Sequence, residues 1–220
     1  MLNGETKNRP GSAARVAVAD RVLAPTYARP ARLFVDGRGA TLLDAEGREH
    51  LDMTSGIAVT ALGHGSEVVR EAMARAAGAP THLSNLYHTD PPIALAERLT
   101  AASFADRVFY CNSGAEAVEA AIKFARLAGG EERRRVVYFD GAFHGRTLGA
   151  LAATDRPDYR EPFEPLAGGF ERAPFDDDAA LDAIDSQTAL VLLEPIQGEK
   201  GVRPADAGWV RRVRERCDRT

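Results

Sequence analysis

The chain has 220 residues, of which 45% are hydrophobic and 27% charged, and its formal net charge is −4. This length allows one large domain, or one domain and part of a second, with the composition of a soluble globular protein. The acidic balance argues against a general nucleic-acid-binding protein, which would carry a basic surface. We expect a cytoplasmic protein because the sequence has no apolar run long enough to span a membrane, no signal-peptide core and no CxxC pair.

The first part of the chain predicts a tail, a small β-rich segment and two helices. Residues 1–12 are polar and predict a disordered tail. Between residues 32 and 52, short apolar runs separated by Asp-Gly and Glu-Gly pairs predict small strands joined by tight turns. Apolar residues at helical spacing predict helices over 66–78 and 91–102.

From residue 107 onward, apolar segments and helical patterns alternate. Strands are expected over 107–111, 134–140 and 188–195, and helices over 112–130 and 207–219. Such alternation predicts an α/β fold with a mainly parallel sheet. The last helix should lead into a further central strand, so we expect the sheet within these residues to be incomplete and to keep an unpaired edge.

Small polar residues stand where the first strand of this series meets its helix, at Asn112, Ser113, Gly114 and Ala115. The first N–H groups of a helix have no partner within the helix and carry a partial positive charge. Because Gly114 allows close approach and Ser113 offers a hydroxyl, this segment predicts a phosphate-binding loop. The alternative is an ordinary helix cap, since Ser and Asn are favoured there in any case.

Two further segments come after predicted strands. Phe143 and Arg146 lie after the strand ending at residue 140, at the edge where open α/β sheets bind ligands. The Phe143 ring suits stacking on a flat ring and Arg146 suits a carboxylate, although a core Phe beside a surface Arg explains the same pattern. Glu194 ends a buried strand and needs a partner, for function or for a structural ion pair. The histidines form no metal-ligand set.

Four segments together resemble one family closely: LDMTSGIAVTALGHG, FADRVFYCNSGAEAVEAAIKFAR, GAFHGRTLGALAAT and LVLLEPIQGEKGV. They stand in the order and approximate spacing found in class III pyridoxal-phosphate-dependent aminotransferases, and the similarity is greatest to the acetylornithine/ornithine branch. The resemblance runs from about Tyr27 to the C-terminus. It implies a type I fold of pyridoxal-phosphate-dependent transferases, truncated, with residues 13–65 in the small domain and residues 66–220 in the first part of the large domain.

The same resemblance implies which residues hold pyridoxal phosphate. Ser113, Gly114 and Ala115 match the loop that grips the phosphate, whereas Phe143 and His144 match the residues beside the pyridine ring.

The resemblance also implies the reaction and its substrate contacts. Arg146 matches an arginine that pairs with the substrate α-carboxylate, Glu199 an acid that pairs with a distant arginine, and Tyr27, more loosely, a substrate-side tyrosine. The implied reaction transfers the amino group of N-acetylornithine, or of ornithine, to 2-oxoglutarate in arginine biosynthesis, giving glutamate, and the implied assembly is a homodimer. Other class III enzymes, acting on ornithine, 4-aminobutyrate or a lysine-pathway semialdehyde, are the alternatives.

The family places its Schiff-base lysine and its pyridine-pairing aspartate after the position of Thr220. The lysines of this chain are Lys7, in the predicted tail, Lys123, roughly 15 Å along its helix from the phosphate end at about 1.5 Å per residue, and Lys200, where the family usually has a small residue. We therefore expect an N-terminal half that is inactive alone. A non-catalytic module that binds pyridoxal phosphate reversibly is the remaining alternative.

Overall fold

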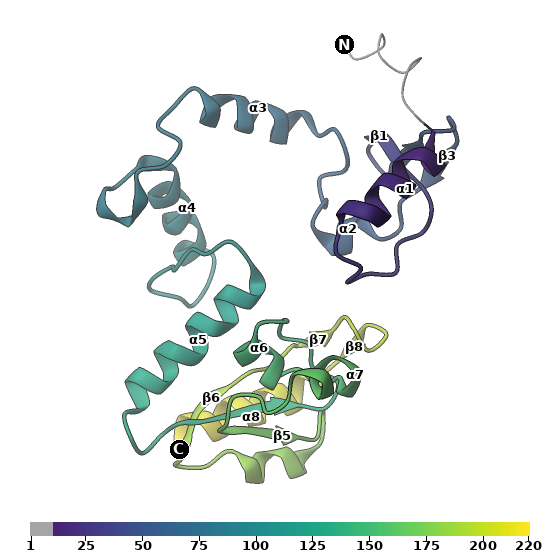
Figure 1. The fold of residues 1–220 in the computed structure, drawn as a ribbon. Coiled ribbons are helices and arrows are strands. Elements are labelled where there is room, and N and C mark those ends of the chain that lie inside the picture. Colours follow the sequence, from purple (N-terminus) through teal and green to yellow (C-terminus); the bar gives the residue numbers. More distant parts are fainter. Residues whose placement is uncertain (1–10) are drawn as a thin grey trace. The chain divides into compact units, whose positions relative to one another are not determined.

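The computed structural model describes residues 11–220, and Figure 1 shows their elements along the chain. The chain divides into two compact units, Met1–Leu95 and Ala96–Thr220. The predicted tail lies outside the described residues except at its end, where Ser12 begins helix α1 (Ser12–Val22). The domain boundary expected between residues 65 and 66 stays a prediction. Within residues 11–220, no helix is both long enough and apolar enough to cross a membrane.

A three-stranded antiparallel sheet forms the centre of the first unit. Its order is β1 (Phe34–Arg38), β2 (Thr41–Asp44) and β3 (Glu49–Leu51), which confirms the small strands predicted between residues 32 and 52. The turn between β2 and β3 is built on Asp44, whose buried carboxylate accepts the Arg48 N–H at 2.9 Å and contacts His50 Nε2 at 2.8 Å.

Four helical segments come after the sheet: α2 (Ser55–Ala58), α3 (Glu67–Ala77), η2 (Ser84–Leu86) and α4 (Asp90–Ala101). Helices α3 and α4 confirm the two helices predicted there. The boundary between the two units lies inside α4.

The second unit contains a parallel sheet in the order β5-β4-β6. The central strand is β4 (Arg135–Phe139), which pairs in parallel with β5 (Phe170–Ala173) and with β6 (Thr188–Val191). All residues of β4 after Arg135 are buried, as a strand with neighbours on both sides requires. The predicted α/β class and two of its predicted strands are therefore confirmed, although β6 ends earlier than expected.

Helices α5 (Gly114–Gly129) and α8 (Ala207–Arg219) confirm the two predicted helices of this unit. Helix α8 lies against the sheet (Figure 1), where Trp209 packs edge-on against Phe139 at a ring distance of 5.2 Å. The shorter elements are α6 (Leu148–Ala152), α7 (Pro157–Arg160), η3 (Glu161–Phe163), η4 (Asp178–Ala183) and the hairpin of β7 (Ile196–Gln197) with β8 (Arg203–Pro204).

The strand predicted over residues 107–111 is wrong: this segment is not a strand and joins neither neighbour of β4. Its Phe109 side chain is half exposed and meets Phe124 of α5 edge-on, with ring centroids 5.6 Å apart. An apolar run becomes a strand only where another strand completes its hydrogen-bond ladder, and within residues 11–220 none does so here.

Candidate functional site

The N-terminus of α5 is built as an open, capped helix end. Ser113 Oγ accepts the Glu116 N–H at 3.2 Å, while the Glu116 carboxylate accepts the Asn112 N–H at 2.8 Å and the Ser113 hydroxyl at 3.1 Å. A Cβ placed on Gly114 would meet no atom within 4 Å, so the space in front of the first turn is open. Hydrogen bonds from Asn112 and Ser113 lower the pKa of Glu116. We call residues 113–115 the cradle.

The loop over residues 141–147 leaves the carboxyl end of β4, and three side chains fix its backbone. Asp155 Oδ2 accepts the Gly141 N–H at 2.7 Å, and Glu194 Oε2 accepts the Phe143 N–H at 2.8 Å. Thr154 Oγ1 accepts the His144 N–H at 3.0 Å. Because β4 and β6 are parallel, Glu194 reaches this loop from the same edge of the sheet.

The loop and the cradle meet at Gly145. Its φ is +134°, and a Cβ placed there would lie 2.9 Å from Ala115 Cβ and 3.0 Å from Ala150 Cβ. Only glycine fits such a backbone at such a separation. The structure therefore brings together two segments that the sequence identified separately, residues 113–115 and residues 143–147.

Burial controls the charge of His144 in this loop. It lowers the pKa of the imidazole to about 4, so the ring is neutral at neutral pH. The Nε2 atom is buried and has no hydrogen-bond partner among the described residues. A buried polar atom without a hydrogen-bond partner lowers the stability of the fold unless a water or a ligand pairs with it.

Arg146 is exposed, and its guanidinium carbon lies 3.7 Å from the centroid of the Tyr159 ring. Arg156 contacts the same ring at 4.9 Å. A guanidinium stacked on an aromatic face keeps its N–H groups in its own plane, where they point away from the aromatic ring and can still donate hydrogen bonds. Arg146 is thus held in position with its charge available to an anion.

Glu194 and Glu199 lie near one another beside the loop. Burial raises the pKa of Glu194, the Phe143 N–H opposes this, and the charge of Glu199 raises it further. Glu199 pairs loosely with Arg156 at 3.9 Å. The structural ion pair considered for Glu194 is not found among residues 11–220, where its hydrogen-bond partner is the Phe143 N–H. A functional role for Glu194 stays a prediction.

Lys200, the departure from the family pattern, packs on the loop. A Cβ at Gly141 would lie 2.7 Å from Lys200 Cγ, so the Lys200 stem fills the space that Gly141 leaves. Burial raises the pKa of Asp155, but the Gly141 N–H, Arg172 and Lys200 together lower it below its usual value. The charge of Lys200 therefore favours the ionised form of Asp155.

Several contributors were not singled out from the sequence: Glu119, Thr154, Asp155, Arg156, Tyr159 and Gln197. Gln197 is fully buried and its amide donates to the Asp140 carbonyl at 2.8 Å. Polar residues in helices and loops carry no periodic signal, so only Gln197, in the same short segment as Glu194 and Glu199, offered a hint. No group of three or more possible metal ligands is gathered anywhere in residues 11–220.

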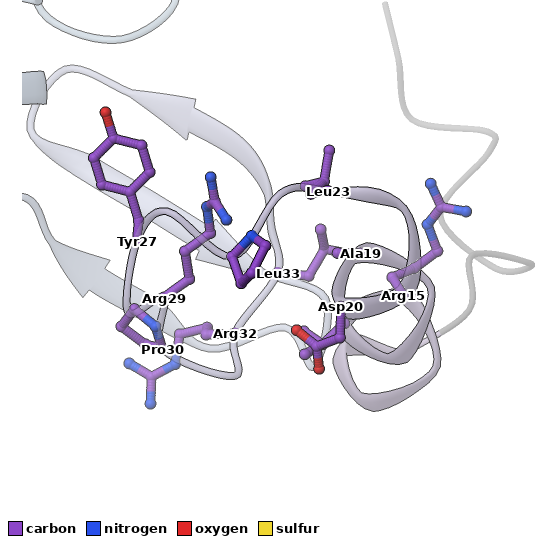
Figure 2. Close-up of a pocket in the computed structure, with 11 residues that line it drawn as sticks. Arg15, Ala19, Asp20, Leu23, Tyr27, Arg29, Pro30, Arg32 and Leu33 are labelled. Carbon is purple, nitrogen blue, oxygen red and sulfur yellow. The ribbon is translucent and has the colours of Figure 1, made fainter.

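Tyr27 belongs to the first unit, where it lines a pocket of about 420 Å³ between α1 and the segment after it (Figure 2). The ring is two-thirds exposed and Arg29 lies over it at 5.2 Å. Arg15, Arg32 and Asp20 also line this pocket.

The second unit combines a parallel sheet, an open helix N-terminus of small residues, and a fixed loop that carries an aromatic residue. These features are typical of α/β proteins that bind phosphorylated ligands at the carboxyl edge of the sheet. The chain belongs to the family described as Aminotransferase class-III, whose sequence profile matches residues 22–220. The resemblance identified from the sequence is confirmed.

Individual relatives agree with this assignment. The chain is 47% identical over 196 residues to an acetylornithine aminotransferase of Methanopyrus kandleri, covering 88% of this chain and 50% of the relative. It is 44% identical over 211 residues to a succinylornithine transaminase of Yersinia enterocolitica, covering 91% and 51%. The ornithine aminotransferase of Toxoplasma gondii, solved with pyridoxal phosphate at partial occupancy in its active site, superposes with a TM-score of 0.88 at 28% identity, covering 94% and 51%. The chain spans about half the length of the relatives it matches.

Proposed function

We propose that this chain supplies the cofactor-binding part of a pyridoxal-phosphate-dependent aminotransferase. The observation that carries the proposal is the contact of the cradle with the loop at Gly145 and Ala115. This contact places the hydrogen-bond donors for a phosphate and the aromatic side chain of Phe143 on adjoining segments. A ligand that combines a phosphate with a flat ring needs both.

The residues fit pyridoxal phosphate. The open space at Gly114 admits an anion to the first turn of a helix 16 residues long, whose N–H groups attract negative charge. Phe143 is half-buried, as suits a side chain that covers one face of a ring. When bound, the cofactor acts as an electron sink for the substrate carbon that carries the amino group. We assign His144, with its orphaned Nε2, to the same cofactor side.

We further propose N-acetylornithine as amino donor and 2-oxoglutarate as acceptor, in a cytoplasmic homodimer. Arg146 supports this proposal because it is exposed, aromatic-stacked and free to pair with a carboxylate in a two-pronged geometry. We assign Glu199 and Tyr27 to the substrate side as well. Succinylornithine is the second candidate donor. The chain is almost as similar to the succinylornithine transaminase, at 44% identity, as to the acetylornithine aminotransferase, at 47%.

A binding titration tests the cofactor proposal. We expect the purified chain to bind pyridoxal phosphate, followed by absorbance, and Ser113→Ala to weaken binding about tenfold, since a hydrogen bond to a charged group contributes about 1.5–3 kcal/mol. Ser66→Ala is the matched control, because Ser66 stands at the N-cap of α3 in the first unit and makes no side-chain cap bond. Absent binding, or equal losses in the two variants, would refute the proposal.

Turnover is a separate question from binding. Lys123 projects from the middle of α5, and Lys200 is packed against Gly141 and faces Asp155. We propose that neither of these two lysines attaches the cofactor, so we expect the 220-residue chain to bind it without transferring an amino group from N-acetylornithine to 2-oxoglutarate. Measurable turnover would overturn this expectation about the lysines and leave the cofactor proposal standing.

A further inference from the structure

Glu119 of α5 holds the far end of the loop. Its Oε1 atom accepts three hydrogen bonds: from Thr147 Oγ1 at 2.5 Å, from the Gly149 N–H at 3.0 Å and from the Ala150 N–H at 3.1 Å. Gly149 leaves room for this carboxylate: a Cβ there would lie 2.5 Å from Glu119 Oε2, so the Glu119 side chain would have to shift.

Helix α6 is consequently capped by another helix and not by its own residues. Thr147 stands at the N-cap of α6 but makes no side-chain cap bond within the helix. Its hydroxyl turns instead to Glu119. Local capping by Thr is common and needs no distant partner, so this arrangement serves to tie α6 to α5.

The two ties between α5 and the loop lie on either side of Arg146. Ala115 meets Gly145, and Glu119, one turn further along the same helix, holds Thr147 and Gly149. The helix that presents the cradle therefore also fixes the loop that carries Phe143 and Arg146. The second tie is charge-assisted, which makes it stronger than a neutral hydrogen bond.

We propose that Glu119 is a positioning residue that sets the spacing between the phosphate cradle and the loop bearing Phe143. The inference rests on the proposed function, since it concerns how one ligand is held at both its phosphate and its ring. A site held at the correct spacing in advance binds more tightly because ordering costs less on binding. In this proposal Glu119 acts through the loop, since its hydrogen-bond partners are Thr147, Gly149 and Ala150.

The experiment compares two probes on the full chain: inorganic phosphate, which needs the cradle alone, and pyridoxal phosphate, which needs cradle and loop together. For Glu119→Ala we expect pyridoxal phosphate to bind about tenfold more weakly, while phosphate affinity stays within about twofold. Glu119→Gln should restore most of the affinity, because its amide oxygen can occupy the Oε1 position. Glu119→Asp keeps the charge but is one methylene too short, and should behave like the Ala variant.

Amide hydrogen exchange supplies a readout that does not depend on either ligand. The amides of Gly149 and Ala150 should exchange faster in Glu119→Ala and return to the wild-type rate in Glu119→Gln. Glu71→Ala is the control, because Glu71 is an exposed helical glutamate of α3 whose ion pair with Arg75 measures 3.8 Å.

The outcomes separate the two proposals. Equal loss of phosphate and pyridoxal phosphate affinity in Glu119→Ala would show general damage to the cradle and overturn the positioning role. No change with either probe, or failure of Glu119→Gln to rescue, would overturn it too. Wild-type chain that binds neither probe would instead overturn the proposed function, and the positioning role with it.

Discussion

Gly145 is the position at which one added methyl group should separate the loop from the cradle. In Gly145→Ala the new Cβ would stand 2.9 Å from Ala115 Cβ and 3.2 Å from Ala115 Cα, whereas ordinary contacts begin at 3.4 Å. The backbone must therefore move by about half an ångström, and it keeps a φ of +134° that L residues rarely adopt. The backbone strain costs about 1–3 kcal/mol and the overpacking about 1–3 kcal/mol.

The expected loss of about 2–6 kcal/mol is large against a typical stability of about 5–15 kcal/mol. Urea unfolding measures it, with the single Trp209 as probe because its side chain is only 1% exposed. Gly168→Ala is the control, since a Cβ there meets nothing within 4 Å and Gly168 has no positive φ. A Gly145→Ala midpoint equal to that of Gly168→Ala would refute the steric argument.

A double variant identifies the partner of the clash. Ala115→Gly removes the closest atom, so in the Gly145→Ala background it should recover part of the lost stability, after subtraction of the cost of Ala115→Gly alone. The part that remains should reflect the φ of +134° and the contact with Ala150. Purely additive effects of the two substitutions would show that Gly145 and Ala115 do not touch.

The remaining predictions concern the cap, the substrate side and pH. Ser113→Ala should lower the free energy of unfolding by about 1 kcal/mol through loss of the α5 cap, measured by urea unfolding. Arg146→Lys should weaken 2-oxoglutarate binding to the cofactor-loaded chain about tenfold in calorimetry, without changing pyridoxal phosphate affinity, because an ammonium lacks the planar fork. Burial lowers the pKa of His144 from 6.5 to about 4, so between these values the unfolded chain binds a proton that the folded chain does not. The contribution of neutral His144 to the free energy of unfolding is thus fully present above pH 6.5 and is lost as the pH falls. Between about pH 7.5 and about pH 5 the loss is about 2 kcal/mol. His144→Asn should remove that part of the loss of stability in urea unfolding at the two pH values.

The elements with a strong periodic pattern were predictable from the sequence. Helices α3, α4, α5 and α8 combine regular apolar spacing with recognisable ends, and β4 is an apolar run of the length of a buried strand. Strand β5 was not predicted, because its four residues include Glu171 and Arg172, which interrupt the apolar signal. The error at residues 107–111 is the converse, since an apolar pattern reports burial but not the presence of a neighbouring strand.

The residues of the candidate site likewise divide into those that the sequence could identify and those that it could not. Ser113, Gly114, Phe143 and Arg146 could be named because each stands a few residues after an apolar run of strand length, where ligand-binding loops of α/β sheets begin. The role of Glu119 could not be predicted from the sequence, because a glutamate inside a helix normally belongs to the solvated face. Its role depends on the approach of α5 to residues 145–150, which is a property of the packing and leaves no mark on local sequence.

The cradle could be interpreted from the sequence either as a helix cap or as a phosphate loop, and the structure explains why the two were hard to separate. The Ser113 hydroxyl and the Asn112 N–H already serve an anion, the Glu116 carboxylate. Under the proposed function, a phosphate that binds at this helix end would exchange one anionic acceptor for another, so it would gain less than the full strength of new hydrogen bonds. The gain that remains comes from the greater charge of the phosphate at the positive end of α5 and from the N–H groups at the open side of Gly114. Under the proposed function, capping and ligand binding at this helix would therefore be competing uses of the same donors, and the carboxylate of Glu116 would keep the cradle ordered until a phosphate replaced it.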